Sequence, residues 1–214
     1  MLNSFLYFFL LFIIYSFIGW IIEMIATFVG TKKLINRGFL IGPYCPIYGF
    51  GALIMLYILS SSKNNIVYLY VMFVVYASLL EYITSYLMEK LFNARWWDYS
   101  KDKYNLNGRI CLSNSLAFGI LGIVLGYIIN PFVVKTLNML SPNTMNWIAI
   151  LLFIIFALDF LITFNIVSRI RKNIILINKD MTEDINKQIS KFIATNHIFK
   201  AFPLLKQKID KIKR

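Results

Sequence analysis

Long apolar stretches constrain this chain more than any other feature of its sequence. Segments at about 5–29, 66–89, 112–134 and 145–167 are almost free of charged residues. Each is about 20 residues or longer, which is what an α-helix needs to cross a bilayer. A further apolar segment, at about 44–60, is shorter, so we expect a helix that starts near Tyr44 or is tilted.

Composition agrees with a membrane protein. Apolar residues make up 59% of the 214 residues and charged residues only 15%, which excludes an ordinary soluble domain. We therefore predict an all-α, polytopic membrane protein with five transmembrane helices. Residues 1–168 form the transmembrane domain, and residues 169–214 form a basic amphipathic tail. The first apolar segment lacks a basic leader and a small-residue cleavage site, so we expect it to remain as a helix.

The distribution of Lys and Arg predicts the orientation of these helices. With five spans, the 30–43 loop, the 90–111 loop and the tail lie on one side, and they hold 20 of the 22 basic residues. The other side holds only Lys63 and Lys135. Because basic residues accumulate on the cytoplasmic side, we expect the N-terminus outside, and both loops and the C-terminus in the cytoplasm.

The tail carries 12 basic and 4 acidic residues. Its apolar residues recur at helical spacing, so it resembles helices that lie on an anionic inner leaflet. Docking onto a soluble partner is the alternative. The tail has no recognisable nucleic-acid-binding module, so we expect no nucleic-acid partner. The apolar positions in question are Ile174, Ile177, Met181, Ile185, Ile189, Phe192, Phe199, Phe202, Leu205, Ile209 and Ile212.

Acidic residues inside the apolar segments are the first candidates for a functional site. A carboxylate in hydrocarbon is costly unless it is paired, hydrated or protonated. Glu23 shares a helical stripe with small and polar residues, and Glu81 and Glu89 share another. These three acids predict a polar cavity open to the cytoplasm. The alternative is that they pair with arginines and fasten helices to loops; Asp159 fits a hydrogen bond between helices better.

Both basic loops differ from ordinary connectors. The first is rich in Gly and Pro from Arg37 onward, so we expect it to fold into the protein. The second carries Trp96 and Trp97, which are typical of membrane-interface anchors. Alternatively, they form an aromatic wall for a ligand, oriented by Asp98.

The spacing of the two loops leaves an internal repeat open. Glu23 precedes Cys45 by 22 residues, as Glu89 precedes Cys111, and Gly42 and Gly108 match at the same offset of 66. Such a pattern occurs in transporters built from repeats.

The sequence lacks the motifs for nucleotide binding by a P-loop and for zinc binding. There is no phosphate-binding Gly-x4-Gly-Lys-Ser/Thr run, and a single His and two Cys give too few soft ligands for a zinc site. We therefore expect no cofactor and no metal.

The sequence resembles a bacterial family of CmpB-like, "type IV" ABC-transporter permeases over about residues 5–135. This resemblance implies a multi-pass protein of the bacterial cytoplasmic membrane with a separate ATPase subunit, and a homo-oligomer is a further expected partner. It rests on Tyr15-Ser16-Phe17-Ile18-Gly19-Trp20, Glu23, Asn36-Arg37-Gly38-Phe39-Leu40, Cys45-Pro46-Ile47-Tyr48-Gly49, Glu81-Tyr82, Trp96-Trp97-Asp98-Tyr99-Ser100 and Asn107-Gly108-Arg109-Ile110-Cys111.

Three functional hypotheses follow. In the first, the chain is the permease component, and the 90–111 loop contacts the ATPase. In the second, it is an enzyme acting on a lipid head group, with Glu23 or Glu81 as general base and Arg37 and Arg109 holding phosphate. In the third, it stabilises a membrane partner. The candidate substrate-binding residues are Glu23, Arg37, Glu81, Glu89, Arg109, Trp97 and Asp98.

Overall fold

The protein is a bundle of apolar helices joined by two folded loops. A computed structural model describes residues 2–33, 35–61, 65–170 and 181–195. Most of the predicted tail, including His197, therefore lies outside the described residues. The elements are α1 (Leu2–Thr31), α2 (Pro46–Ser61), α3 (Ile66–Phe92), β1 (Asn105–Leu106), β2 (Ile110–Cys111), α4 (Leu112–Val124), η1 (Leu125–Ile129), α5 (Asn130–Leu137), α6 (Pro142–Ile170) and α7 (Thr182–Thr195).

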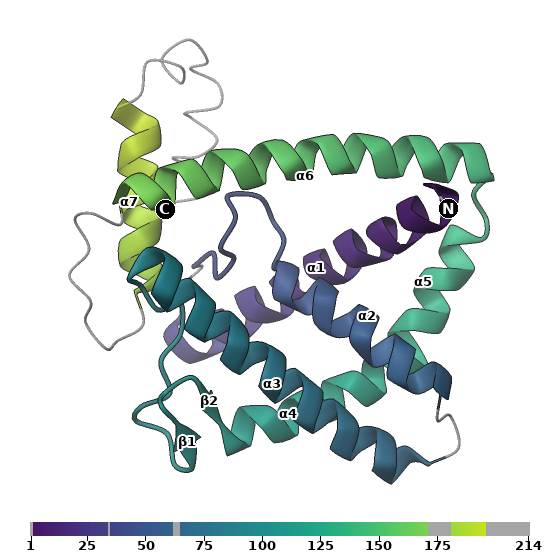
Figure 1. Ribbon diagram of the computed structural model, residues 1–214, viewed down its shortest axis with the longest axis horizontal. Coiled ribbons are helices and arrows are strands. Elements are labelled where there is room, and N and C mark those ends of the chain that lie inside the picture. The colour runs from purple at the N-terminus through teal and green to yellow at the C-terminus, as the bar shows by residue number, and fades with distance from the viewer. Residues whose placement is uncertain (1, 34, 62–64, 171–180, 196–214) are drawn as a thin grey trace.

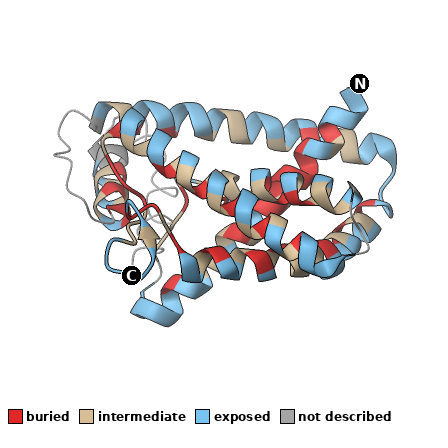
Figure 2. Cartoon of the chain, turned by 60° about the horizontal axis from the view of Figure 1, so that its bottom comes forward, coloured by how far each residue is buried: buried red, intermediate tan, exposed pale blue. Residues whose placement is uncertain are grey.

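Four helical segments are long and apolar enough to cross a membrane. They are α1, α3, the α4–η1–α5 segment and α6, and they coincide with four of the predicted spans. The remaining one is not confirmed, because α2 has 16 residues and therefore rises only about 24 Å, less than the ~30 Å of a hydrocarbon core. Along α6 most residues are exposed (Figure 2), and their apolar side chains suit contact with lipid.

Successive helices run in alternating directions between the two ends of the molecule (Figure 1). As a result, the loop before α2 and the loop before α4 lie at the same end, and α7 joins them there. The amide of Met181 donates to the carbonyl of Arg95 at 2.9 Å, and the side-chain amide of Asn186 donates to the carbonyl of Asn36 at 2.6 Å. The two loops and the described part of the tail thus form one end of the fold.

The span at 112–134 is not the uninterrupted α-helix that its hydropathy predicts. Five residues, Leu125–Ile129, form a π-helical turn between α4 and α5. Pro131 follows in the first turn of α5. Because proline has no N–H and its ring displaces the preceding turn, the ladder of i to i−4 bonds cannot continue unchanged through it. A π turn is one way in which a helix absorbs this disruption.

Glycines allow two pairs of helices to pack closely. A Cβ atom on Gly49 of α2 would lie 2.3 Å from Oγ of Ser16 in α1, and one on Gly122 of α4 would lie 2.4 Å from the ring of Phe73 in α3. The largest buried cluster includes Tyr15, Leu69 and Phe73. The core therefore lies where α1, α2 and α3 meet the α4–α5 segment.

The described part of the tail differs from the expected helix lying on a leaflet. Met181, just before α7, and Ile185 and Ile189 within it recur every four residues and form one face. All three are buried, in a cluster with Trp96, Val167 and other apolar residues. The apolar face of α7 thus packs on the protein itself, which leaves the opposite face, with the exposed pair Glu183 and Lys187, toward the surroundings.

Candidate functional site

A large cavity lies among the helices. Its volume is about 830 Å³, and its lining comes from α1, α2, α3, α4, α6 and both loops. Most of the lining is apolar or aromatic. Five of the seven candidate residues from the sequence line it: Glu23, Arg37, Glu81, Trp97 and Asp98.

Glu23 reaches the cavity beside a tyrosine of α2. The hydroxyl of Tyr48 donates to Oε1 of Glu23 at 2.6 Å. The ring of Tyr48 lies directly against Gly19, where a Cβ atom would come within 2.2 Å of it. Gly19 precedes Glu23 by one helical turn, so the ring crosses α1 at the glycine and places its hydroxyl on the acid one turn further along.

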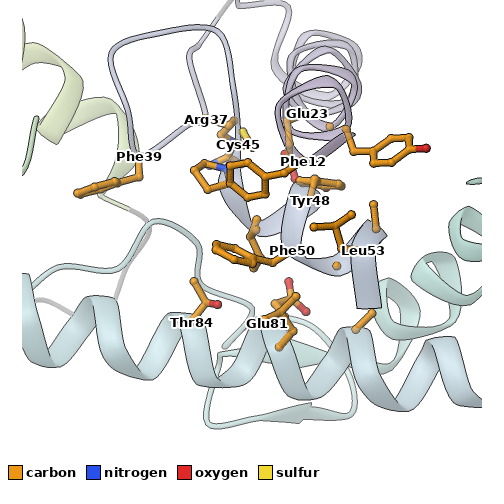
Figure 3. A pocket seen from close by; sticks show the side chains of 18 of the residues that line it. Phe12, Glu23, Arg37, Phe39, Cys45, Tyr48, Phe50, Leu53, Glu81 and Thr84 are labelled. Atoms are coloured by element: carbon orange, nitrogen blue, oxygen red, sulfur yellow. The ribbon is translucent and has the colours of Figure 1, made fainter. Parts of the chain in front are cut away.

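Glu81 enters the cavity from α3. Its side chain points away from α3 toward α2 (Figure 3), and the residue is only 5% exposed. The hydroxyl of Tyr99, from the loop before α4, donates to Oε1 of Glu81 at 3.0 Å. The other oxygen, Oε2, is buried and has no hydrogen-bond partner among the described residues. A buried acceptor without a partner is rare in folded proteins, because its lost hydration is not replaced.

Burial and nearby acids raise the pKa values of two loop residues at this site, Tyr99 and Cys45. Burial, followed by the charges of Glu81 and Glu23, raises the pKa of the Tyr99 phenol well above its usual value, so Tyr99 remains a hydrogen-bond donor at neutral pH. Burial and the charge of Glu23 also raise the pKa of the Cys45 thiol to about 12. The charges of both acids therefore act on Tyr99, and that of Glu23 acts on Cys45 as well.

Arg37 contributes a positive charge to the cavity lining. Its Nε donates to Oγ1 of Thr27 at 3.1 Å, and its Nη1 donates to Oγ1 of Thr182 at 3.5 Å. The side chain therefore connects the end of α1 to the start of α7. Neither Glu23 nor Glu81 forms an ion pair with a basic residue within the described part of the chain.

Glu89 and Arg109 lie in a separate cluster next to the cavity. Oε2 of Glu89 accepts from Nε of Arg95 at 2.6 Å and from Nη1 of Arg109 at 2.8 Å. Arg109 also stacks on the rings of Tyr82 and Tyr86. For Glu89, the pairing alternative of the sequence is therefore confirmed: it fastens the loop before α4 to the end of α3. Neither Glu89 nor Arg109 is among the described residues that line the cavity.

Trp96 and Trp97 help to hold the loop before α4 in place. Trp96 is 5% exposed and packs on Phe39 and Phe92, which is not the environment of a membrane-interface anchor. Trp97 donates from its indole N–H to the carbonyl of Arg109 at 2.9 Å. Both line the cavity, whereas the partners of Asp98 are Ser100 and Arg95 and not a tryptophan.

Asp98 is held inside a turn of the same loop. Its Oδ1 accepts from the amide and hydroxyl of Ser100. Gly108, at φ +67°, lies close enough that a Cβ atom there would collide with Asp98. The preceding residue, Asn107, also has positive φ. These two residues are the centre of a turn that the amide of Arg109 closes by donating to the carbonyl of Leu106 at 3.0 Å, within the three-residue connection between β1 and β2. The role of Asp98 in the structure is thus to shape the loop.

Asp159 fastens the other loop. Its carboxylate accepts from the amides of Ile41 and Gly42, at 3.3 and 2.8 Å, and from the hydroxyl of Tyr44 at 2.6 Å. Thr163, one turn along α6, adds a further donor at 2.9 Å. Asp159 is therefore a hydrogen-bonding residue, as the sequence predicts, but it joins a helix to a loop and not to a second helix.

Sequence reasoning missed the two tyrosines that hold the acids. Both stand in the motif-bearing segments, Tyr48 just after Cys45-Pro46 and Tyr99 just after Asp98. A buried acid without an arginine partner needs another hydrogen-bond donor. The tyrosines within these motifs were therefore the sequence signal that could have identified the donors.

The architecture and the cavity define an α-helical membrane protein that has four helical segments long and apolar enough to span a bilayer and acidic side chains inside its helical bundle. The model of the family described as "Putative ABC-transporter type IV" matches residues 10–164. The chain belongs to this CmpB family. The match extends beyond the 5–135 region of the quoted motifs and includes most of α6. No curated protein and no solved structure matches the chain.

Proposed function

We propose that this protein is the membrane permease component of an ABC-type transporter and that its substrate passes through the cavity between α1, α2 and α3. The observation that carries the proposal is the meeting of Glu23, Tyr48, Glu81 and Tyr99 in one cavity of about 830 Å³. That volume is within the range of sites for small molecules, which are typically apolar with a few placed polar groups.

The arrangement of the loops supports an orientation for the permease. Both basic loops and α7 lie at one end of the fold (Figure 1). Basic residues favour the cytoplasmic side, so this end faces the cytoplasm and the N-terminus lies outside. In this orientation α2, although short, crosses the bilayer against α1.

The loop before α4 provides the contact for a separate ATPase. Its tip carries Tyr104, which is 81% exposed, and Leu106, which is 55% exposed, beside Lys101 and Lys103. Exposed aromatic and apolar residues within a charged rim are typical of protein interfaces. Tyr99 of the same loop donates a hydrogen bond to Glu81, so a movement of this loop on ATPase binding would displace a side chain of the cavity.

The test is purification of the tagged chain from its native membrane, followed by measurement of ATP hydrolysis. We expect an ATPase subunit to copurify with the wild-type chain and to be lost with Tyr104→Ala combined with Leu106→Ser. The matched control is Asp102→Asn, in the same loop and also exposed. If no ATPase accompanies the wild-type chain, or if the tip variant retains it fully, the proposal is wrong.

The enzyme hypothesis requires a phosphate clamp that this geometry does not assemble. Arg109 lies against Glu89 and Ser85, outside the described lining of the cavity, whereas Arg37 lies at the junction of α1 and α7. Arg37 therefore lines the cavity with Glu23 and Glu81 but without Arg109, the second arginine of the hypothetical clamp. The geometry favours the permease.

A further inference from the structure

We infer that the cavity binds an amphipathic organic cation, with a protonated amine at Oε2 of Glu81 and an apolar body along the aromatic walls. This inference rests on the proposed function and names the substrate class of the same site. It starts from the one buried polar atom that has no partner among the described side chains, Oε2 of Glu81.

Oε2 of Glu81 can accept a hydrogen bond from a ligand. Tyr99 already satisfies Oε1 of Glu81, and Tyr48 satisfies Oε1 of Glu23, so each acid is oriented by a phenol while Oε2 of Glu81 is left over. An ammonium group supplies up to three N–H donors and a positive charge. A charge-assisted bond to a carboxylate is stronger than a neutral one, most of all where water is excluded.

The charges along the lining favour a cation over an anion. Three acids and one base occur among the described lining residues: Glu23, Glu81, Asp98 and Arg37. Asp98 is paired with Arg95, and Arg37 is directed to Thr27 and Thr182 at the end of α1. The two remaining acids, Glu23 and Glu81, have no basic partner within the described residues, so an anion entering this region would be repelled.

The walls determine what the rest of the ligand must be. Phe12, Phe50, Phe118 and Phe156 line the cavity from four different elements. Aromatic faces attract cations and also bury apolar groups. A small inorganic cation would leave these walls unused, and no group of three or more metal-ligating side chains occurs in the part of the chain that the structure describes. An aryl or alkyl amine uses both the acid and the walls.

The experiment compares three probes with the same phenylbutyl body and different heads. They are 4-phenylbutylammonium, 4-phenylbutanol and 4-phenylbutyrate, titrated against the full chain in nanodiscs, with signal from empty nanodiscs subtracted. We expect the ammonium to bind at least tenfold more tightly than either other probe. Glu81→Gln should weaken ammonium binding at least tenfold and leave the alcohol unchanged, whereas Asp102→Asn should change neither.

Each other outcome would overturn the inference. These outcomes are equal or tighter binding of the alcohol or carboxylate, unchanged ammonium affinity in Glu81→Gln, and no ammonium binding to the wild type. If Glu81→Gln does not fold, Glu23→Gln carries the comparison, with a loss of ammonium affinity expected. The binding assay contains no ATPase, so its failure alongside successful copurification of an ATPase rejects the substrate class and leaves the permease proposal standing.

Discussion

The hydroxyl of Tyr99 donates to Oε1 of Glu81 at 3.0 Å, which joins the loop before α4 to the middle of α3. The same loop is fixed at its other side by Glu89, through Arg95 and Arg109. Glu81 thus lines the cavity and accepts a hydrogen bond from a neutral phenol. Its other oxygen, Oε2, has no hydrogen-bond partner among the described residues. Glu89 instead holds the loop through ion pairs with two arginines.

Removal of the Tyr99 hydroxyl should destabilise the protein through Glu81. In Tyr99→Phe, neither oxygen of Glu81 keeps a described partner, and an unsatisfied buried acceptor costs about 1–3 kcal/mol. The free energy of unfolding should fall by about that amount. In Glu81→Met no acceptor remains, so adding Tyr99→Phe should cost much less. A double-mutant cycle measures this coupling, and strictly additive effects would contradict the contact.

Gly19 should tolerate no side chain. An alanine Cβ there would lie 2.2 Å from the Tyr48 ring, so Gly19→Ala must displace the ring and break its bond to Glu23. We expect a lower thermal unfolding midpoint. Gly30→Ala is the matched control in the same helix, because nothing lies within 4 Å of its Cβ. It should be neutral or stabilising by up to about 1 kcal/mol, since alanine favours helix. Equal effects of the two substitutions would contradict the packing of α1 on α2.

Cys45 should react slowly with alkylating reagents. The thiolate is the reactive form, and a pKa raised from 9.0 to about 12 lowers its fraction at pH 8 by about 1,000-fold. Reactivity should keep rising as the pH passes 9, where an ordinary thiol levels off. The measurement is the rate of iodoacetamide labelling in Cys111→Ser, with Lys101→Cys in a chain lacking both native cysteines as the exposed control. Equal rates in the folded proteins would show that Cys45 is not buried beside Glu23.

Loss of the Asp159 carboxylate should loosen the loop before α2. Asp159→Leu removes the acceptor for the amides of Ile41 and Gly42 and for the Tyr44 hydroxyl. Hydrogen exchange of the amides at 38–44 should become faster, whereas exchange in the loop before α4 stays unchanged. Protection of residues 38–44 that is unaffected by the substitution would mean that another contact holds this loop.

A polar side chain on the buried face of α7 should release it from the two loops. Ile185 is 1% exposed in the cluster around Trp96, so Ile185→Asn should increase hydrogen exchange throughout α7. Lys187→Gln, on the exposed face, should have little effect, because an exposed ion pair adds little stability. If the two variants exchange alike, α7 does not pack on the protein as described.

Local patterns in the sequence were sufficient to predict the long helices and to place Glu23 and Glu81 on helix faces that line the cavity. Hydropathy placed α1, α3 and α6 closely, and the helical stripe separated Glu23 from the lipid-facing residues. Two local signals were available and not used: Pro131 marks the disruption in the fourth span, and Asn107-Gly108 is typical of a tight hairpin turn.

The remaining features depend on contacts that no local pattern encodes. Tyr99 reaches Glu81 across 18 residues, and Asp159 reaches Gly42 across 117. The apolar face of α7 was visible in its spacing, but spacing alone does not distinguish a helix packed on protein from one packed on lipid. The same limit applies to Glu89, which has the sequence environment of Glu81 and yet lies between two arginines.

The most direct test of the central claim is the labelling of carboxyl groups by an apolar carbodiimide, which modifies acids in apolar surroundings. Mass spectrometry of the full chain in nanodiscs should find Glu81 and Glu23 modified, with protection by 4-phenylbutylammonium. Glu89, held between Arg95 and Arg109, should remain unmodified. Modification of Glu89 ahead of Glu81, or labelling of Glu81 and Glu23 that the ammonium does not reduce, would contradict a ligand cavity shared by these two acids.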